Sequence, residues 1–241
     1  MHTALVALLL TARLYSMVDL PAGDRAAATM VAGNILRSAG IGMLWTDCNP
    51  QQSAHSPATN QVCLTPPRSD EVMVRVVAAP ASPDGSQKAG LDTLGDAYVD
   101  TAAASGSLAT VYVDRVSLMA RRAGIDAGTL LGRVMAHEIG HLLLGTAIHR
   151  ASGLMRAEWS AALLQRRIAN DWRLSRPDAA QARAGMLRRA TLAGYGPPAA
   201  TLPCPALSNP STQAICPSCP VCATLLPADR MSFDLLVEPR F

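Results

Sequence analysis

Lysine and aromatic residues are scarce in this chain of 241 residues. Lys88 is the one lysine among 21 basic residues, and Phe, Trp and Tyr together make up 4% of the chain. The formal net charge is only +3, and the arginine-rich stretch from Arg166 to Arg189 lacks the regular interleaving of aromatic residues that nucleic-acid-binding surfaces use. We interpret this stretch as solvated helix surface, and no nucleic-acid partner is expected.

Long apolar runs are also missing. No segment reaches the roughly 20 apolar residues that a transmembrane helix needs, so no membrane span is expected. The apolar start, Met1 to Leu10, has no Lys or Arg before Arg13, and it fits either an opening β-strand or a truncated signal peptide. We favour the strand, because residues 5–18 are rich in strand-compatible side chains.

Six cysteines fall into two groups, and the first group is Cys48 with Cys63. An even number of cysteines is typical of an exported, oxidised protein, so a secreted or otherwise extracytoplasmic location is expected. A Cys48–Cys63 disulfide would close a loop of about 15 residues and gain on the order of 3 kcal/mol in the chain-entropy model. Two free thiols in a cytosolic protein are the alternative.

The second group of cysteines lies in residues 195–241, which are rich in Pro, Ser and Thr and predict a loop-rich tail. Two Cys-x-x-Cys units overlap at Cys219, whereas a zinc ribbon needs two separated pairs. Disulfides or a loosely ordered tail are therefore favoured for Cys204, Cys216, Cys219 and Cys222.

Length and apolar content predict one substantial domain with an appendage. Periodicity predicts strands at residues 12–20, 41–45, 72–79, 97–100 (an edge strand) and 109–116. It predicts helices at residues 22–38, 117–123, 127–144, 157–172 and 177–190. Residues 47–70 and 80–107 are expected to be mostly loop.

The expected helix at 127–144 carries the chemistry. Asp126 is a plausible N-cap, and Gly145 offers a left-handed stop. Positions i and i+4 of a helix share one face, so His137 and His141 can bind one metal ion, with Glu138 on the neighbouring flank. Such a carboxylate acts as a general base on water in zinc hydrolases and is not a ligand. On an otherwise apolar helix these groups would be costly unless they were paired or bound to metal.

A third metal ligand is needed, and three residues can supply it: His149, Glu158 or the more distant Asp171. We favour His149. Glu158 also suits the first turn of the expected helix 157–172, where the helix dipole favours a carboxylate.

A longer motif resembles the signature of the metzincin metallopeptidases, which is H-E-x-x-H-x-x-G-x-x-H followed by a methionine in a tight turn. Here it reads His137-Glu138-x-x-His141-x-x-x-Gly145-x-x-x-His149, with Ser152-Gly153-Leu154-Met155 after it. One extra residue precedes the glycine and one more precedes the third histidine. A helix that runs through Leu144 and a longer turn can still return His149 to the metal.

The resemblance implies an α+β fold, with a twisted mixed sheet of four to five strands packed on the active-site helix. Residues 1–194 would form the catalytic domain, with an N-terminal subdomain to about 145 and a helical C-terminal subdomain after it. His137, His141 and His149 would bind Zn²⁺, and Met155 would lie in the turn beneath the site.

Arg156 follows Met155, where some metzincins place a tyrosine close by. Two roles are open for it: contact with a substrate carboxylate or the tetrahedral intermediate, or a structural hydrogen-bonding role over the turn, which we favour.

The sequence therefore predicts a zinc-dependent hydrolase, an endopeptidase, that acts as a monomer on a peptide or protein substrate with Glu138 as general base. The strand at 109–114 or the edge at 97–100 would pair with the extended substrate. A non-catalytic zinc-binding or interaction protein with the same fold is the alternative.

Overall fold

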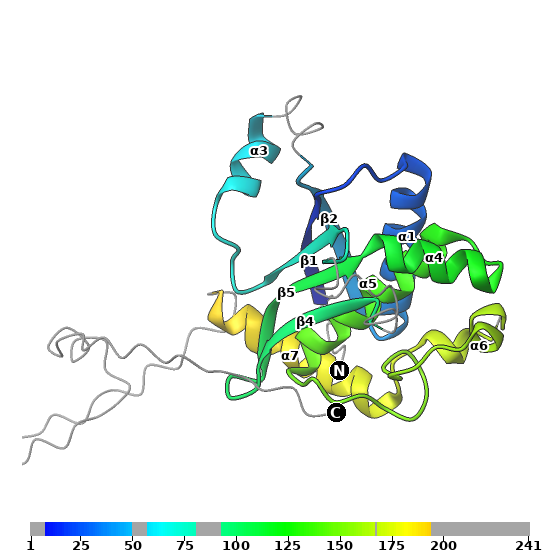
Figure 1. The fold of residues 1–241 in the computed structure, drawn as a ribbon. Coiled ribbons are helices and arrows are strands. Elements are labelled where there is room, and N and C mark those ends of the chain that lie inside the picture. The colour runs from blue at the N-terminus through cyan, green and yellow to red at the C-terminus, as the bar shows by residue number, and fades with distance from the viewer. Residues whose placement is uncertain (1–7, 50–56, 81–92, 167, 194–241) are drawn as a thin grey trace, which may run out of the picture. The chain divides into compact units, whose positions relative to one another are not determined.

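A five-stranded sheet in the order β2-β1-β3-β5-β4 forms the centre of the fold (Figure 1). The computed structural model describes residues 8–49, 57–80, 93–166 and 168–193. The strands are β1 (Leu8–Ser16), β2 (Ile41–Asp47), β3 (Glu71–Val77), β4 (Gly95–Asp100) and β5 (Ser105–Tyr112). Four are parallel, and β4 lies antiparallel to β5 as an outer strand. The sheet is thus mixed, as predicted.

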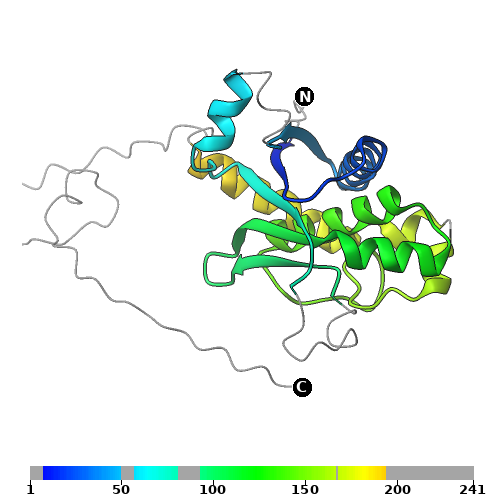
Figure 2. The same cartoon turned by 45° about the horizontal axis from the view of Figure 1, so that its top comes forward.

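The helices are α1 (Ala22–Ser38), α3 (Pro57–Leu64), α4 (Val113–Ala123), α5 (Ala127–Leu144), α6 (Ala161–Gln165) and α7 (Arg176–Leu192), with a 3₁₀ turn η1 (Ala169–Trp172). Figure 2 shows the dark-blue α1 beside the green α4 and α5. Alternate residues of the strands, such as Leu10, Val74 and Val111, are fully buried in one core with Leu36 of α1 and Ile139 of α5. Among the described helices, none combines the length and apolarity that crossing a bilayer requires.

Helix α5 begins and ends where the sequence predicts. The Asp126 side chain accepts a hydrogen bond from the Thr129 amide at 2.6 Å, and Gly145 ends the helix with φ of 64°. Nearly all its residues are buried, because the sheet, α1, α4 and α7 pack around it. This burial fixes the helix that carries His137 and His141.

Replacing Gly145 with alanine is expected to lower the free energy of unfolding by about 2–4 kcal/mol, from left-handed strain and overpacking together. A Cβ there would lie 2.2 Å from the Ala104 backbone. Gly124 is the matched control, because its φ is 65° and a Cβ would meet nothing within 4 Å. Gly124→Ala should cost only about 1 kcal/mol in urea unfolding. Equal losses in the two variants would contradict the packing at Ala104.

Several predicted boundaries are wrong. The first strand, expected at 12–20, spans Leu8–Ser16, and β5 begins at Ser105, in a segment expected to be mostly loop. The strand expected at 109–116 ends at Tyr112, and α4 begins at Val113. Two β-branched valines suggested a continuing strand, but Val116 packs into the core from the helix, and the Asp114 side chain accepts a hydrogen bond from the Ala79 amide at 2.8 Å. Tertiary contacts therefore override the local preference for strand.

The helix expected at 157–172 is broken into α6 and η1. The Ser160 hydroxyl accepts a hydrogen bond from the Leu163 amide and starts α6 only at Ala161. Arg133 donates to the Leu164 carbonyl at 3.2 Å and stacks over Trp172 at 3.9 Å. Arg133 of α5 thus donates a hydrogen bond to the Leu164 carbonyl, which in a longer helix would accept one from a backbone amide.

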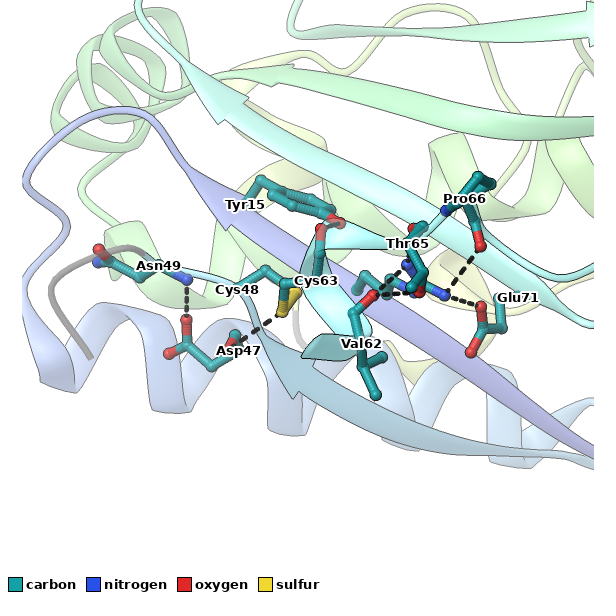
Figure 3. The surroundings of a disulfide bond; sticks show 10 residues. Tyr15, Asp47, Cys48, Asn49, Val62, Cys63, Thr65, Pro66 and Glu71 are labelled. Atoms are coloured by element: carbon teal, nitrogen blue, oxygen red, sulfur yellow. Dashed lines mark hydrogen bonds and ion pairs between the residues drawn. A yellow bond between two sulfur atoms is a disulfide. The ribbon is translucent and has the colours of Figure 1, made fainter. Parts of the chain in front are cut away.

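Helix α3 was not predicted, and it lies in the segment expected to be loop. The predicted Cys48–Cys63 disulfide is present and joins α3 to the end of β2, with a Cα–Cα distance of 5.5 Å (Figure 3). The Tyr15 hydroxyl donates to the Cys63 carbonyl at 3.1 Å. These contacts hold α3 against β1 and β2.

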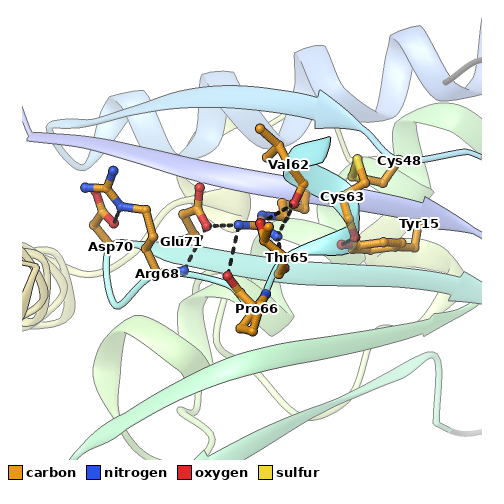
Figure 4. Close-up of polar contacts among 10 residues, drawn as sticks. Tyr15, Cys48, Val62, Cys63, Thr65, Pro66, Arg68, Asp70 and Glu71 are labelled. Atoms are coloured by element: carbon orange, nitrogen blue, oxygen red, sulfur yellow. Dashed lines mark hydrogen bonds and ion pairs between the residues drawn. A yellow bond between two sulfur atoms is a disulfide. The ribbon is translucent and has the colours of Figure 1, made fainter. Parts of the chain in front are cut away.

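A buried arginine completes this attachment. Arg13 of β1 is 2% exposed and donates to the carbonyls of Val62 and Thr65, both at 2.6 Å, at the C-terminal end of α3. It also forms an ion pair with Glu71, and the Arg68 amide donates to the same carboxylate at 2.9 Å (Figure 4). Since a buried charge needs such partners, Arg13 explains why the segment after α3 returns to the sheet here.

Replacing both Cys48 and Cys63 with alanine is expected to lower the free energy of unfolding by about 3 kcal/mol, because the open loop gains chain entropy in the unfolded state. Urea unfolding with and without reductant measures the effect. The reduced wild type should match the variant, whereas a variant as stable as the oxidised wild type would contradict the expectation.

Candidate metal centre

Three imidazoles converge at the C-terminal half of α5. His137 and His141 lie one helical turn apart, and their Nε2 atoms are 3.1 Å from each other. His149 comes from the loop after Gly145, and its Nε2 lies 3.3 Å from that of His141. The three ligand-type atoms all lie within 4.8 Å of one another. The structure therefore brings together the three histidines that the sequence singled out.

Backbone carbonyls fix the orientation of two of these rings. His137 Nδ1 lies 2.7 Å from the Leu154 carbonyl oxygen, and His141 Nδ1 lies 2.8 Å from that of Thr146. A carbonyl can only accept a hydrogen bond, so each Nδ1 carries the proton and each Nε2 keeps its lone pair. Such second contacts orient histidine ligands in metal sites.

The donor set fits zinc. Neutral imidazole lone pairs that face one another cannot hydrogen-bond to each other, and a cation between them removes the repulsion. Zinc–nitrogen bonds of about 2.0–2.1 Å at tetrahedral angles separate two ligand nitrogens by roughly 3.3 Å. The separations of His141 Nε2 from those of His137 and His149, 3.1 and 3.3 Å, are close to that value, and all three ligand atoms lie within 4.8 Å of one another.

Burial keeps these histidines neutral, as metal binding requires. It lowers the pKa of His137 to about 4, and the hydrogen bond to Leu154 offsets only part of the effect. Burial also lowers the pKa of His141. It lowers the pKa of His149 as well, although this residue is less deeply buried. Protons therefore do not compete with a cation at neutral pH.

Glu138 lies beside the cluster and is 5% exposed. Burial raises the pKa of this carboxyl to about 8, and the charge of Asp96 on β4 adds to the rise. A Cβ at Gly95 of β4 would lie 2.8 Å from Glu138 Oε1, so only glycine lets the strand approach this closely. A divalent cation at the imidazoles would counter the effect of burial and favour the carboxylate.

Met155 packs against α5 at Gly140. It is 1% exposed, and a Cβ at Gly140, between His137 and His141, would lie 2.6 Å from its Sδ. The Met155 carbonyl accepts a hydrogen bond from the Arg150 amide at 2.7 Å. The side chain therefore fills the space between α5 and the returning loop.

His137 and His149 line a pocket of about 720 Å³. One wall comes from residues 93–95, at and before the start of β4, and another from residues 156–160, after Met155. Met119, Val134 and Leu163 make part of it apolar. Trp159 stands edge-on to His137 with ring centroids 5.5 Å apart.

The two carboxylates weighed as third ligands lie outside the cluster. Glu158 is exposed and lines the pocket, and Asp171 forms an ion pair with Arg166 at 3.5 Å. Sequence reasoning missed Gly95 and Trp159 as parts of the site. Gly95 falls in a segment without periodicity, so no sequence signal pointed to it, whereas a tryptophan close after the motif was a usable signal for Trp159.

The fold and this cluster define a mixed α/β protein with a three-histidine site that fits zinc. No protein-family model and no curated protein sequence matches the chain. Among solved structures, archaemetzincin from Methanopyrus kandleri is similar, with a TM-score of 0.46 and 13% identity over 75% of this chain and 97% of that chain.

Two further solved structures also show a low similarity to this chain. Metalloproteinase-II from Bacteroides fragilis gives a TM-score of 0.44 and 14% identity over 75% of this chain and 54% of that chain. A zinc-dependent peptidase from Methanocorpusculum labreanum gives a TM-score of 0.44 and 15% identity over 73% of this chain and 99% of that chain. The similarities are low overall, so the functional argument rests on the side chains of the site.

Proposed function

We propose that this protein is a zinc-dependent hydrolase, an endopeptidase of metzincin type, with His137, His141 and His149 as the zinc ligands. The observation that carries the proposal is the convergence of three neutral imidazoles beside a buried carboxylate in an open pocket. The buried Met155 at the turn supports the metzincin resemblance.

Bound zinc supplies Lewis acidity, which polarises a substrate carbonyl and lowers the pKa of water. Glu138 takes the proton from the attacking water and delivers it to the leaving amine. The close approach of Gly95 limits where the Glu138 carboxylate can lie. The Leu154 and Thr146 carbonyls keep His137 and His141 in the tautomer that offers Nε2. No covalent intermediate forms.

The substrate pairs with β4. This strand is an outer strand of the sheet and Gly95 at its start lines the pocket, whereas β5 lies inside the sheet between β3 and β4. An unpaired strand edge accepts an extended peptide through main-chain hydrogen bonds. Hydrogen exchange of residues 95–100 should slow when a peptide hydroxamate binds, and unchanged exchange would refute this placement.

The Cys48–Cys63 disulfide supports the proposal that the protein works in an oxidising compartment outside the cytosol, since such bonds are rare in reducing ones.

The decisive experiment measures zinc by mass spectrometry and hydrolysis of a fluorogenic peptide library on the same preparation, before and after chelation. One zinc per chain with chelator-sensitive cleavage is expected. Zinc without cleavage would favour a non-catalytic zinc-binding protein, and a protein that takes up no zinc would exclude both.

A further inference from the structure

The segment after Met155 places a guanidinium in the wall of the pocket. Arg156 lines the same pocket as His137, Glu138 and His149. Among the described residues of that wall it is the one arginine, and no lysine accompanies it. Arg156 is therefore the basic residue beside the space in which a substrate would lie.

The Arg156 guanidinium has no partner among the residues that the structure describes, and its Nε is buried. Other arginines nearby are engaged: Arg150 donates to Asp178 at 2.9 and 3.0 Å, and Arg133 donates to a carbonyl of α6. The structural hydrogen-bonding role favoured for Arg156 from the sequence is thus not what the structure shows. A buried donor group without an acceptor is costly, so the Arg156 side chain can gain from a partner beyond the residues that the structure describes.

The backbone that carries this arginine is held firmly. The Trp159 indole Nε1 donates to the Arg156 carbonyl at 3.2 Å, and the Arg150 amide donates to the neighbouring Met155 carbonyl. Met155 itself is buried against Gly140 of α5, the residue before His141. The base of the side chain is therefore fixed relative to the candidate metal centre.

The remaining charges of the pocket do not neutralise Arg156. Glu158 also lines the wall, but it is exposed and forms no ion pair with Arg156. The Glu138 carboxylate lies against Gly95 of β4, where a Cβ would be 2.8 Å from its Oε1. Among the described residues that line the pocket, neither carboxylate forms an ion pair with Arg156.

We propose that Arg156 binds a carboxylate of the substrate and makes this hydrolase selective for peptides with an acidic group close to the scissile bond. The inference rests on the proposed function. A guanidinium presents a planar fork of donors that matches a carboxylate in two parallel hydrogen bonds. The carboxylate belongs either to an Asp or Glu side chain or to the C-terminus of the substrate.

Binding to the zinc-loaded Glu138→Gln protein tests this apart from cleavage. Labelled peptides are compared in matched pairs by fluorescence anisotropy, one series with Glu or Gln at each position and one with a free or amidated C-terminus. The carboxylate member of one series should bind about 10–100-fold more tightly, as expected for a hydrogen-bonded charge pair. Which series responds identifies the source of the carboxylate.

Adding Arg156→Gln should reduce that ratio to about 1, and Arg156→Lys should retain part of it. Arg121→Gln, an exposed arginine of α4 that does not line the pocket, removes the same charge and should leave the ratio unchanged. Glu158→Gln should keep or increase the ratio. Zinc content and melting temperature confirm that each variant is folded.

Equal ratios with and without Arg156, or no carboxylate preference in either series, would overturn the proposal. Its failure is distinguishable from that of the proposed function. A carboxylate preference that needs Arg156, in a wild type that cleaves no peptide, sinks only the hydrolase assignment. Cleavage without any preference sinks only the role of Arg156.

Discussion

Glu138→Gln is expected to lower kcat/KM for peptide hydrolysis by about 10²–10⁴-fold while zinc content stays at the wild-type level. Glutamine keeps the shape of the side chain and removes its ability to take a proton. The melting temperature should not fall, because a buried carboxyl with a pKa raised to about 8 contributes no stabilising charge in the metal-free protein. Hydrolysis rates of a cleavable peptide give kcat/KM, and metal analysis of the same samples gives the zinc content.

Glu158→Gln is the matched control for this loss, since it removes a carboxylate from the exposed part of the same pocket. Its kcat/KM on a neutral peptide should fall by far less than that of Glu138→Gln. If Glu138→Gln kept wild-type activity, another group would have to move the proton. If it lost zinc, Glu138 would be a ligand instead of a base.

His149→Ala is expected to weaken zinc binding by at least about 100-fold. Loss of a residue that only orients a metal ligand costs about 10–100-fold in affinity, and loss of the ligand itself should cost more. Unlike His137 and His141, His149 is exposed and belongs to a loop. The metal-free variant should therefore melt at the same temperature as the metal-free wild type. Competition with a fluorescent chelator gives the zinc affinity.

Glu158→Ala separates the two candidates for the third ligand. Its zinc affinity should equal that of the wild type, because Glu158 lies outside the histidine cluster. The reverse pattern, with zinc retained by His149→Ala and lost by Glu158→Ala, would move the third ligand to Glu158.

Helix α5 shows how much of the fold local sequence can predict. Its start depends on the Asp126 cap and its end on Gly145, and both signals act within one turn of the boundary they set. The spacing of His137 and His141 then follows from helix geometry alone. The predicted α1 also matches residues 22–38 as observed, because Pro21 and Gly40 flank it.

The errors arise where a distant side chain decides the backbone. Helix α3 is held by Arg13 and by a disulfide to β2, and neither contact has a counterpart in the sequence around residue 60. The split between α6 and η1 depends on Arg133, about 30 residues earlier. Periodicity within a short window cannot contain such contacts.

The candidate site also has a part that the local sequence predicts and a part that depends on distant segments. Its histidines and Glu138 lie within one stretch of 13 residues and were visible as a motif. The facing wall comes from Gly95 and its neighbours, which only the sheet brings to α5. That Arg156 Nε has no partner among the described residues likewise depends on segments far from it in the sequence.

The carbonyls of Leu154 and Thr146 have a consequence for how metal enters and leaves. Both belong to the chain after α5, so the ring hydrogen bonds of His137 and His141 join the helix to the returning loop without any ion. These two rings lose their rotational freedom when the chain folds. Cation binding therefore does not have to order them again and carries no further entropy cost for it. Chelation should therefore be reversible on the time scale of metal diffusion and release, with the chain staying folded throughout.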